Sequence, residues 1–268
     1  MPESKPDTSS AEAYESILVP EVFRPWAEVL VREARIPDGA RTLDLACGTG
    51  IVARGAARLV GARGRSTGVD IDPAMIQVAK SAALREGLQI DYLCASAGEL
   101  PFEATSFDAA LCQQGLQYFP EKEKALAELH RVLRPNARLV AAVWTEMQEC
   151  AGNWAMITAL ERRDIDAKDM RKPFSLSDPV AMRTPAEAAG FADVTVQTVR
   201  RLARFPSVKA FVEAIGQGAP SSRLALAKVP PQDWSGFVAD VEAQLAPWSR
   251  GGPLEFPMAI NLLSARRS

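Results

Sequence analysis

The sequence has very few of the residues from which metal centres and histidine-based catalysts are built. Its 268 residues include one histidine, and its four cysteines, Cys47, Cys94, Cys112 and Cys150, stand far apart with no CxxC pair. Metal-binding motifs place several cysteines or histidines at short spacings. We therefore expect no metal site, and we interpret the cysteines as small apolar residues on or near buried strands.

An excess of charge of one sign and long apolar runs are missing as well. The formal net charge is −2 at pH 7, whereas nucleic-acid-binding domains usually carry clustered lysine and arginine. No apolar run reaches the roughly 18 residues that a membrane-spanning helix needs, and the start MPESKPDTSS lacks the apolar segment of a secretion signal. These absences predict a cytoplasmic protein without an integral membrane segment and without a nucleic-acid partner.

The composition that remains is typical of a folded protein with a sizeable core. Hydrophobic residues make up 47% of the chain and charged residues 24%, which suits one large domain with additions or two small domains. The polar residues 1–10 are expected to form a flexible tail. We predict that residues 11–268 form a single domain, because no internal repeat is present and the late inserts are typical of a lid.

Strand-like and helical segments alternate regularly up to Trp144. Such alternation indicates parallel βαβ units with right-handed crossovers, and hence an α/β fold. Upstream of it, Pro20 and Pro25 are expected to divide an N-terminal helical region into two pieces. The alternating segments include the predicted strands Thr67–Val69, Ile90–Cys94, Phe107–Cys112 and Arg138–Trp144 and the predicted helices Pro73–Glu86 and Glu121–Leu133.

Beyond Trp144 the alternation loosens, and two long inserts interrupt it. They cover about 146–175 and about 206–253, and the second is broken by several glycines and prolines. The last strands are predicted at Val194–Leu202 and Glu255–Ala265. We predict that the two inserts form a helical lid over a site.

A glycine turn follows the first strand-like segment, in the sequence LDLACGTG at 43–50. Glycines at 48 and 50 permit a sharp turn and a close approach to a ligand, and the helix that follows directs its free N–H groups toward the turn. Asp70 ends the next predicted strand, where a carboxylate can accept hydrogen bonds from ribose hydroxyls. The turn is therefore predicted to hold a nucleotide-like ligand.

Two positions distinguish a dinucleotide from another adenosyl ligand. The dinucleotide fingerprint has a third glycine where this chain has Ala53, a replacement that the fingerprint sometimes tolerates. Asp44, just before the turn, would repel a pyrophosphate and attract the amine of a cofactor. The sequence favours a cofactor that carries an amine, and an NAD-dependent oxidoreductase remains the alternative.

Six short motifs extend through the first half of the chain. DLACGTG at 44–50 is followed by GVDIDPAMI at 68–76, ELPF at 99–102, SFD at 106–108, QQGLQYFP at 113–120 and LHRVLRP at 129–135. In this order they resemble class I S-adenosylmethionine-dependent methyltransferases, and within these the ubiquinone/menaquinone-type small-molecule methyltransferases. The resemblance implies a Rossmann-like, seven-stranded, mostly parallel sheet with helices on both faces, N-terminal helices and helical lid inserts near the last strands.

The resemblance also implies S-adenosyl-L-methionine as the cofactor and assigns residues to it. Asp44 and the backbone of 46–50 would face the methionine part, and Asp70 would bind the ribose. Ser96 stands where relatives usually carry aspartate, so the adenine amino group would lose a charged acceptor. The implied cofactor-binding residues are Tyr14, Asp44, Ala46, Cys47, Gly48, Thr49, Gly50, Asp70, Ile71, Met75, Ser96, Ala97, Gln113 and Gln114.

Catalysis is predicted to proceed without histidine. Relatives often carry histidines where this chain has Gln117 and Tyr118, whereas His130 falls inside a predicted helix and is interpreted as structural. Methyl transfer from a sulfonium mainly requires alignment and exclusion of water. We predict that Gln117 and Tyr118 orient the acceptor; packing under the lid is the alternative for Tyr118, and Glu146 or Glu149 could supply a base.

The predicted function is S-adenosylmethionine-dependent methylation, on oxygen, nitrogen or carbon, of a small aromatic or quinone-like metabolite. Proximity and desolvation would drive the reaction. A relative that binds the cofactor without transferring methyl is the second alternative, and the sequence does not predict the oligomeric state. The predicted substrate pocket consists of Phe23, Trp26, Trp144, Trp154 and Phe174.

Overall fold

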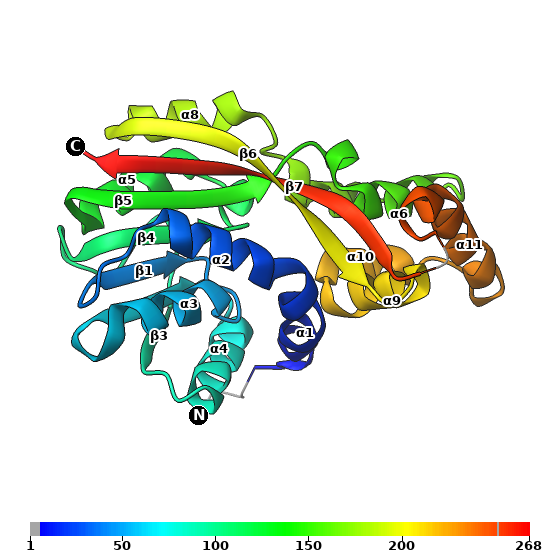
Figure 1. Cartoon of the computed structure of the whole chain (residues 1–268), viewed down its shortest axis with the longest axis horizontal. Helices are drawn as coiled ribbons and strands as arrows, with labels where there is room; N and C mark the ends of the chain where they lie inside the picture. The colour runs from blue at the N-terminus through cyan, green and yellow to red at the C-terminus, as the bar shows by residue number, and fades with distance from the viewer. Residues whose placement is uncertain (1–5, 251) are drawn as a thin grey trace.

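A seven-stranded sheet forms the centre of the computed structural model, which describes residues 6–250 and 252–268 (Figure 1). The strand order is β3-β2-β1-β4-β5-β7-β6; the first five strands in the chain are parallel, and β7 is antiparallel to both neighbours. The Rossmann-like, mostly parallel sheet is therefore confirmed. Its strands are β1 (Arg41–Leu45), β2 (Arg65–Asp70), β3 (Ile90–Cys94), β4 (Phe107–Gln113), β5 (Leu133–Trp144), β6 (Phe191–Phe205) and β7 (Leu254–Arg267).

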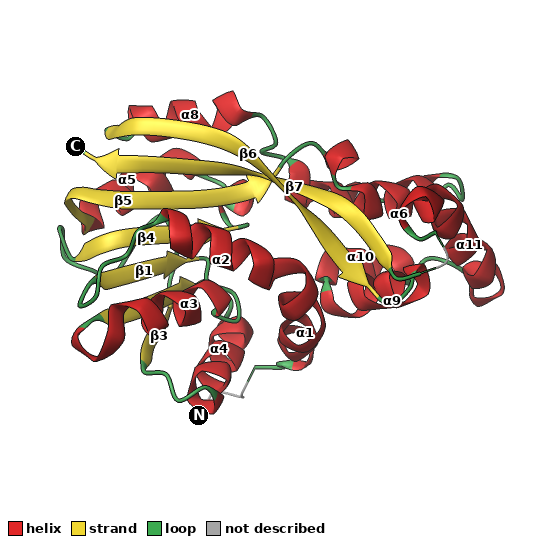
Figure 2. Cartoon of the chain, in the orientation of Figure 1, coloured by secondary structure: helices red, strands yellow, loops and turns green. Residues whose placement is uncertain are grey.

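Helices cover both faces of the sheet (Figure 2). Alternation along β5 shows why: Val140 and Ala142 are buried with α2 and α3, whereas Leu139, Ala141 and Val143 are buried with α5 and α8. Side chains of a strand point alternately to opposite faces, so a strand covered on both sides reads as a continuous apolar run. The helices around the sheet are α2 (Arg24–Glu33), α3 (Ile51–Val60), α4 (Pro73–Arg85), α5 (Lys122–Val132) and α8 (Pro179–Ala188).

The N-terminal region is one nearly continuous helical segment, so the expected division into two pieces is wrong. α1 (Ser9–Ala13) passes into the π-helical segment η1 (Tyr14–Phe23), which continues into α2. Pro20 lies inside η1, where the wider π-helical turn accommodates a residue without an N–H group. Residues 1–5 of the predicted tail lie outside the described residues, and the helix begins within the predicted tail at Ser9.

The lid is built on the two longest strands, which extend past the rest of the sheet (Figure 1). Both β6 and β7 exceed their predicted lengths. Phe205, Phe211 and Phe256 join them to the lid, with ring centroids 5.0 to 6.2 Å apart. The lid helices, which coincide with the two predicted inserts, are α6 (Ala151–Glu161), α7 (Lys168–Arg171), α9 (Val208–Gly218), α10 (Pro220–Leu226) and α11 (Trp234–Leu245).

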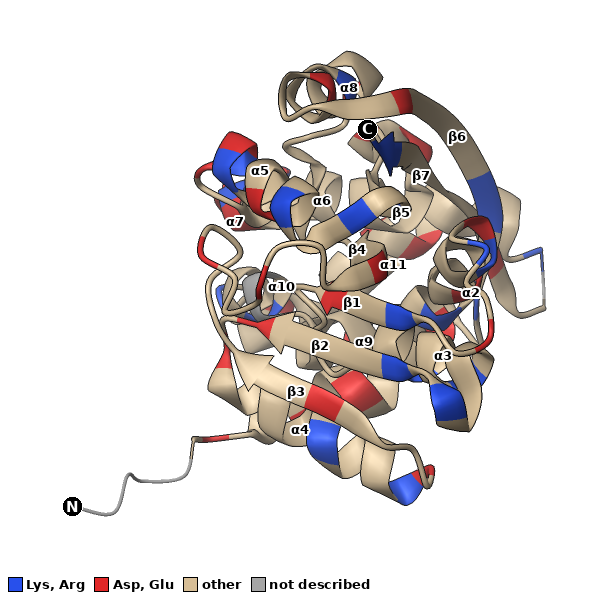
Figure 3. Cartoon of the chain, turned by 90° about the vertical axis from the view of Figure 1, so that its left-hand side faces the viewer, with Lys and Arg blue, Asp and Glu red and all other residues tan. Residues whose placement is uncertain are grey.

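The surface and the cysteines can be compared with the sequence expectations. Acidic and basic residues are interspersed along the chain on the side of the molecule that Figure 3 shows. In the described part of the chain, no helix combines the length and apolar character needed to cross a membrane, and no cluster of histidine, cysteine and carboxylate side chains could hold a metal ion. Cys47, Cys112 and Cys150 are buried as predicted, but Cys94 is exposed because β3 is an edge strand.

Candidate active site

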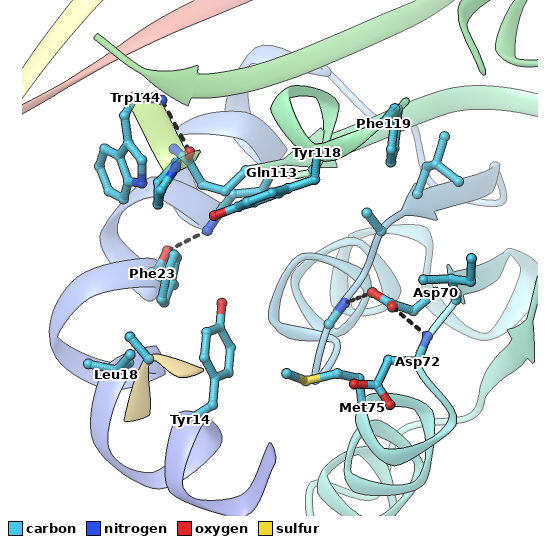
Figure 4. A pocket seen from close by; sticks show the side chains of 18 of the residues that line it. Tyr14, Leu18, Phe23, Asp70, Asp72, Met75, Gln113, Tyr118, Phe119 and Trp144 are labelled. Carbon is cyan, nitrogen blue, oxygen red and sulfur yellow. Dashed lines mark hydrogen bonds between the residues drawn. The ribbon is translucent and has the colours of Figure 1, made fainter. Parts of the chain in front are cut away.

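A cavity of about 550 Å³ opens at the carboxyl ends of the parallel strands (Figure 4). The glycine turn after β1, the end of β2, the loop after β3 and the end of β4 form its floor, and η1 and the lid close it. Ligands of open α/β sheets bind at this edge. The predicted site residues that line the cavity are Tyr14, Phe23, Ala46, Gly48, Asp70, Ile71, Met75, Ser96, Ala97, Gln113, Gln114, Tyr118 and Trp144.

The turn after β1 has the backbone that its glycines permit. Gly48 and Gly50 adopt φ values of 54° and 85°. A Cβ on Gly48 would meet no atom within 4 Å, whereas a Cβ on Gly50 would collide with Tyr92. Ala46 also has a positive φ, 55°, a strained conformation for alanine of the kind found at functional sites. The turn is thus packed against Tyr92 at Gly50, whereas Gly48 leaves room on the cavity side for a ligand.

Asp44 is a buried carboxylate with one unused acceptor. Its side chain is 2% exposed; Ala53 N donates to Oδ2 at 2.9 Å, and Oδ1 has no hydrogen-bond partner. Burial raises the pKa of Asp44 to about 8. The carboxylate does not line the cavity, but its charge contributes to the raised pKa of Tyr14, which does. An ammonium group in the cavity would favour the ionised form, so Asp44 fits a cofactor with an amine.

Cofactor binding is expected to depend on pH through Asp44. The raised pKa means that the carboxyl of the free protein is protonated below about pH 8, and pairing with an ammonium releases that proton. The association constant of S-adenosylhomocysteine should therefore rise by up to about tenfold per unit between pH 5.5 and 7. Calorimetry should show this rise reduced in Asp44→Asn and for methylthioadenosine, which lacks the amine. An equal slope in all three titrations would contradict the role.

Asp70 is held in place at the end of β2 by two backbone donors. Gly48 N donates to Oδ2 at 2.8 Å and Asp72 N donates to Oδ1 at 3.0 Å (Figure 4). Burial raises the pKa of Asp70. A carboxylate has about four acceptor positions, so both oxygens can still accept from a ribose. Ile71 and Met75 line the cavity beside it.

The loop after β3 adds the predicted adenine contacts. Ser96 and Ala97 both line the cavity. Ser96 Oγ accepts a weak hydrogen bond from Gly98 N at 3.3 Å, so its hydroxyl proton remains free to donate. The loop therefore offers a neutral hydroxyl where the family resemblance implies a carboxylate.

Three glutamines are placed at and just beyond the end of β4. Gln113 Nε2 donates to Phe23 O at 3.0 Å and so connects the strand to η1. Gln114 Oε1 accepts from Trp144 N at 3.1 Å and from Gln117 Nε2 at 3.0 Å. Gln117 is buried and does not line the cavity. Any influence of Gln117 on a ligand would therefore pass through Gln114.

Aromatic side chains form the wall nearest the N-terminal helices. Tyr14 packs on Phe23 with ring centroids 4.9 Å apart, and Phe23 lies 6.3 Å from Trp144. The hydroxyl groups of Tyr14 and Tyr118 point into the cavity (Figure 4). Tyr118 is 54% exposed as a residue, and desolvation at the cavity raises the pKa of its hydroxyl to about 12. The phenol is therefore a hydrogen-bond donor and not a base near neutral pH.

Some predicted site residues do not line the cavity. Trp26 lies behind Trp144, with its ring edge-on at 5.9 Å, and Phe174 is buried in the lid core. Trp154 packs against the same core, although the adjacent Asn153 reaches the cavity. The predicted site residues absent from the cavity wall are Asp44, Cys47, Thr49, Gly50, Gln117, Trp26, Trp154 and Phe174.

The other candidate bases also lie elsewhere. His130 packs edge-on against Phe191 at 5.2 Å, which fits its interpretation as structural. Glu149 accepts a hydrogen bond from Arg200 Nη2 at 2.6 Å. His130, Glu149 and Glu146 are all absent from the cavity wall.

Sequence reasoning missed part of the lid wall and a buried ion network. Phe205, Phe256 and Met258 line the cavity from the long strands β6 and β7; alternation through Leu254, Phe256, Met258 and Ile260 was the available signal. Arg54 is fully buried: Nη1 donates to Thr49 O at 2.5 Å, Nη2 donates to Glu15 Oε1 at 2.7 Å, and Nε lies 3.1 Å from Glu86 Oε1. This network joins the glycine turn to η1.

Sequence comparison finds a related domain in the part of the chain that forms this floor. Residues 43–141 match the family model described as a methyltransferase domain. The chain is 36% identical over 121 residues to the ubiquinone/menaquinone biosynthesis C-methyltransferase of Hahella chejuensis, a match that covers 44% of this chain and 49% of the relative. The chain thus spans about half the length of the curated relatives it matches.

Solved structures share the fold over most of the chain. The Haemonchus contortus phosphoethanolamine N-methyltransferase 2, in complex with phosphomonomethylethanolamine and S-adenosylhomocysteine, has a TM-score of 0.61 at 18% identity, covering 97% of this chain and 57% of that one. The [4+2]-cyclase SpnF has a TM-score of 0.57 at 21% identity, covering 91% and 80%. At these identities the likeness concerns the fold.

Proposed function

We propose that this chain, of which residues 43–141 match a methyltransferase domain, is a class I S-adenosylmethionine-dependent methyltransferase that transfers a methyl group from S-adenosyl-L-methionine to a small aromatic or quinone-like metabolite. One observation carries the proposal. A single cavity joins the turn residue Gly48 and the carboxylate Asp70 to an apolar wall that includes Phe205 and Phe256. Such a cavity suits a polar adenosyl group at one end and an apolar acceptor at the other.

In this mechanism the cofactor supplies, when bound, an electrophilic methyl group on a positively charged sulfur. Asp70 would accept hydrogen bonds from its ribose, Asp44 would balance its ammonium group, and the backbone of Gly48 would line its methionine part. The aromatic wall of Tyr14, Phe23 and Trp144 and the lid would exclude water from the reacting atoms. Alignment and desolvation of this kind account for most of what a methyl displacement requires.

No general base is assigned in the proposal. Among the described residues, the acidic side chains of the cavity wall are Asp70, Asp72 and Glu121, and Asp70 is already engaged by backbone donors. Tyr14 and Tyr118 remain protonated, since burial raises the pKa of each. The acceptor would therefore have to be nucleophilic by itself, as an amine, an acidic phenol or an activated carbon is.

Two other functions use the same fold. An NAD-dependent enzyme would place pyrophosphate at the turn, close to the buried Asp44, and neither the matched family model nor the relatives named above favour an oxidoreductase. The fold shared with a cyclase keeps a reaction without methyl transfer as the second candidate. Detection of a transferred methyl group distinguishes the proposed methyltransferase from an enzyme that catalyses a reaction without methyl transfer.

The test is a transfer assay with methyl-labelled S-adenosylmethionine under nitrogen. The acceptors would be 1,4-dihydroxynaphthalene, 1-naphthol and 1-naphthylamine, with phosphoethanolamine as a charged comparison. The labelled methyl group is expected to appear in at least one of the apolar acceptors and not in phosphoethanolamine. Cofactor binding without label in any apolar acceptor would contradict the proposed acceptor class.

Tyr118→Phe is expected to lower turnover by about tenfold, the size of one lost hydrogen bond. The ring stays in place, so the dissociation constant of S-adenosylhomocysteine should change by less than about twofold. Steady-state kinetics with the best acceptor of the assay, together with calorimetry, separates the two effects. Full turnover in the variant would assign Tyr118 to packing under the lid.

A further inference from the structure

The side chain of Gln114 offers an unpaired donor at the cavity. Its Oε1 accepts hydrogen bonds from both Trp144 N and Gln117 Nε2. The backbone N–H group of Trp144 can only donate, so the Gln114 atom that faces it must be the oxygen. The amide is thereby fixed with Nε2 on the opposite side. That Nε2 is buried without a partner, although Gln114 lines the cavity.

The backbone around Gln114 is strained and tightly packed. Gln114 has a φ of 55°, in the left-handed region, which is strained for glutamine. The next residue is pressed against the glycine turn, since a Cβ on Gly115 would stand 2.5 Å from the Cβ of Ala46. A buried N–H donor without a partner is costly, and a strained segment that maintains one points to a ligand that accepts the hydrogen bond.

The lid side of the cavity limits what that ligand can be. Its described lining residues are apolar, such as Phe211, Ile215 and Met258, or uncharged and polar, namely Asn153 and Ser222. The charged lining residues come from the other side, at the end of β2 and the start of α5. A group on the lid side is thus expected to be apolar with few polar atoms.

We propose that Gln114 Nε2 donates a hydrogen bond to a carbonyl, enol or phenol oxygen of the methyl acceptor, and so selects apolar ring systems that carry such an oxygen. The proposal rests on the proposed function, and it assigns to the acceptor a residue that the family resemblance assigned to the cofactor. Gln117 is a positioning residue, because it donates to the oxygen that orients the amide.

The test uses two probes that differ only in a carbonyl oxygen, 1-tetralone and tetralin. A ketone accepts a hydrogen bond but cannot donate one to the glutamate of a variant. Their dissociation constants are measured by calorimetry on protein saturated with S-adenosylhomocysteine, for the wild type, Gln114→Met and Gln114→Glu. The glutamate variant retains an acceptor for Trp144 N but loses the donor. In both variants the affinity of 1-tetralone relative to tetralin should fall by about tenfold, the value of one hydrogen bond.

Each outcome decides the proposal. If Gln114 has only a structural role, the variants should weaken the binding of both probes equally. An affinity ratio unchanged from that of the wild type would therefore overturn the inference. Absence of binding of both probes to the wild type would also overturn it. If the wild type fails to bind S-adenosylhomocysteine, the proposed function itself fails; if it binds and only the ratio is unchanged, the proposed function stands without this contact.

Discussion

Arg54→Met lowers the free energy of unfolding by about 3 to 5 kcal/mol, the range found when one partner of a buried ion pair is removed. Arg54 is fully buried, while Glu15 and Glu86 are 15% and 31% exposed. Methionine fills much of the volume but leaves Glu15 Oε1 and Thr49 O without the donor that Arg54 supplies, and it removes one of the two arginines paired with Glu86. Urea denaturation followed by tryptophan fluorescence measures the loss as a lower midpoint with an unchanged slope.

The matched control is Arg58→Met, which removes an arginine bound to the same glutamate. Arg58 is 52% exposed, and exposed pairs contribute about 0 to 1 kcal/mol. The control should therefore shift the midpoint only slightly. Equal shifts in the two variants would mean that the buried network does not stabilise the junction of η1 with the glycine turn.

Asp70→Ala weakens cofactor binding by about 2 to 3 kcal/mol, which is the loss of charge-assisted hydrogen bonds to the ribose. The expected change in the dissociation constant of S-adenosylhomocysteine is about 30- to 150-fold. The variant also removes the acceptor of Gly48 N and Asp72 N, so the turn loses an anchor. Calorimetric titration at pH 7.5 measures the change.

Asp91→Ala serves as the control for loss of one negative charge on the neighbouring strand, at the end of the sheet away from the cavity. Asp91 is exposed on β3, lies 3.4 Å from Arg65 and does not line the cavity. Its removal should change the affinity by less than about threefold. An unaltered affinity in Asp70→Ala would exclude this carboxylate from ribose binding.

The first half of the fold could be predicted because local signals and burial agree there. The strands β1, β2 and β4 are short and mostly buried, so each appears as a short run of mainly apolar or small residues between turns. Asp72 accepts a hydrogen bond from Ala74 N at 2.8 Å and so caps α4, and Pro73 follows it. Signals of this kind are read directly from neighbouring residues.

The lid wall and η1 could not be predicted from local patterns. Phe205 and Met258 reach the cavity only because β6 and β7 extend past the sheet. That length depends on pairing between residues from 49 (Phe205 with Leu254) to 76 (Phe191 with Arg267) positions apart. Pro20 predicted a break that tertiary packing of Leu18 and Val22 overrides. Arg54 is separated from Glu15 by 39 positions, so no spacing rule links them.

The central claim is that the turn and Asp70 hold an adenosyl cofactor with an amine. The most direct test is calorimetric titration of the protein with S-adenosylmethionine, S-adenosylhomocysteine and NAD in parallel. The account predicts saturable binding of both adenosyl amino acids and no heat of binding with NAD. Binding of NAD without binding of either adenosyl amino acid would contradict it.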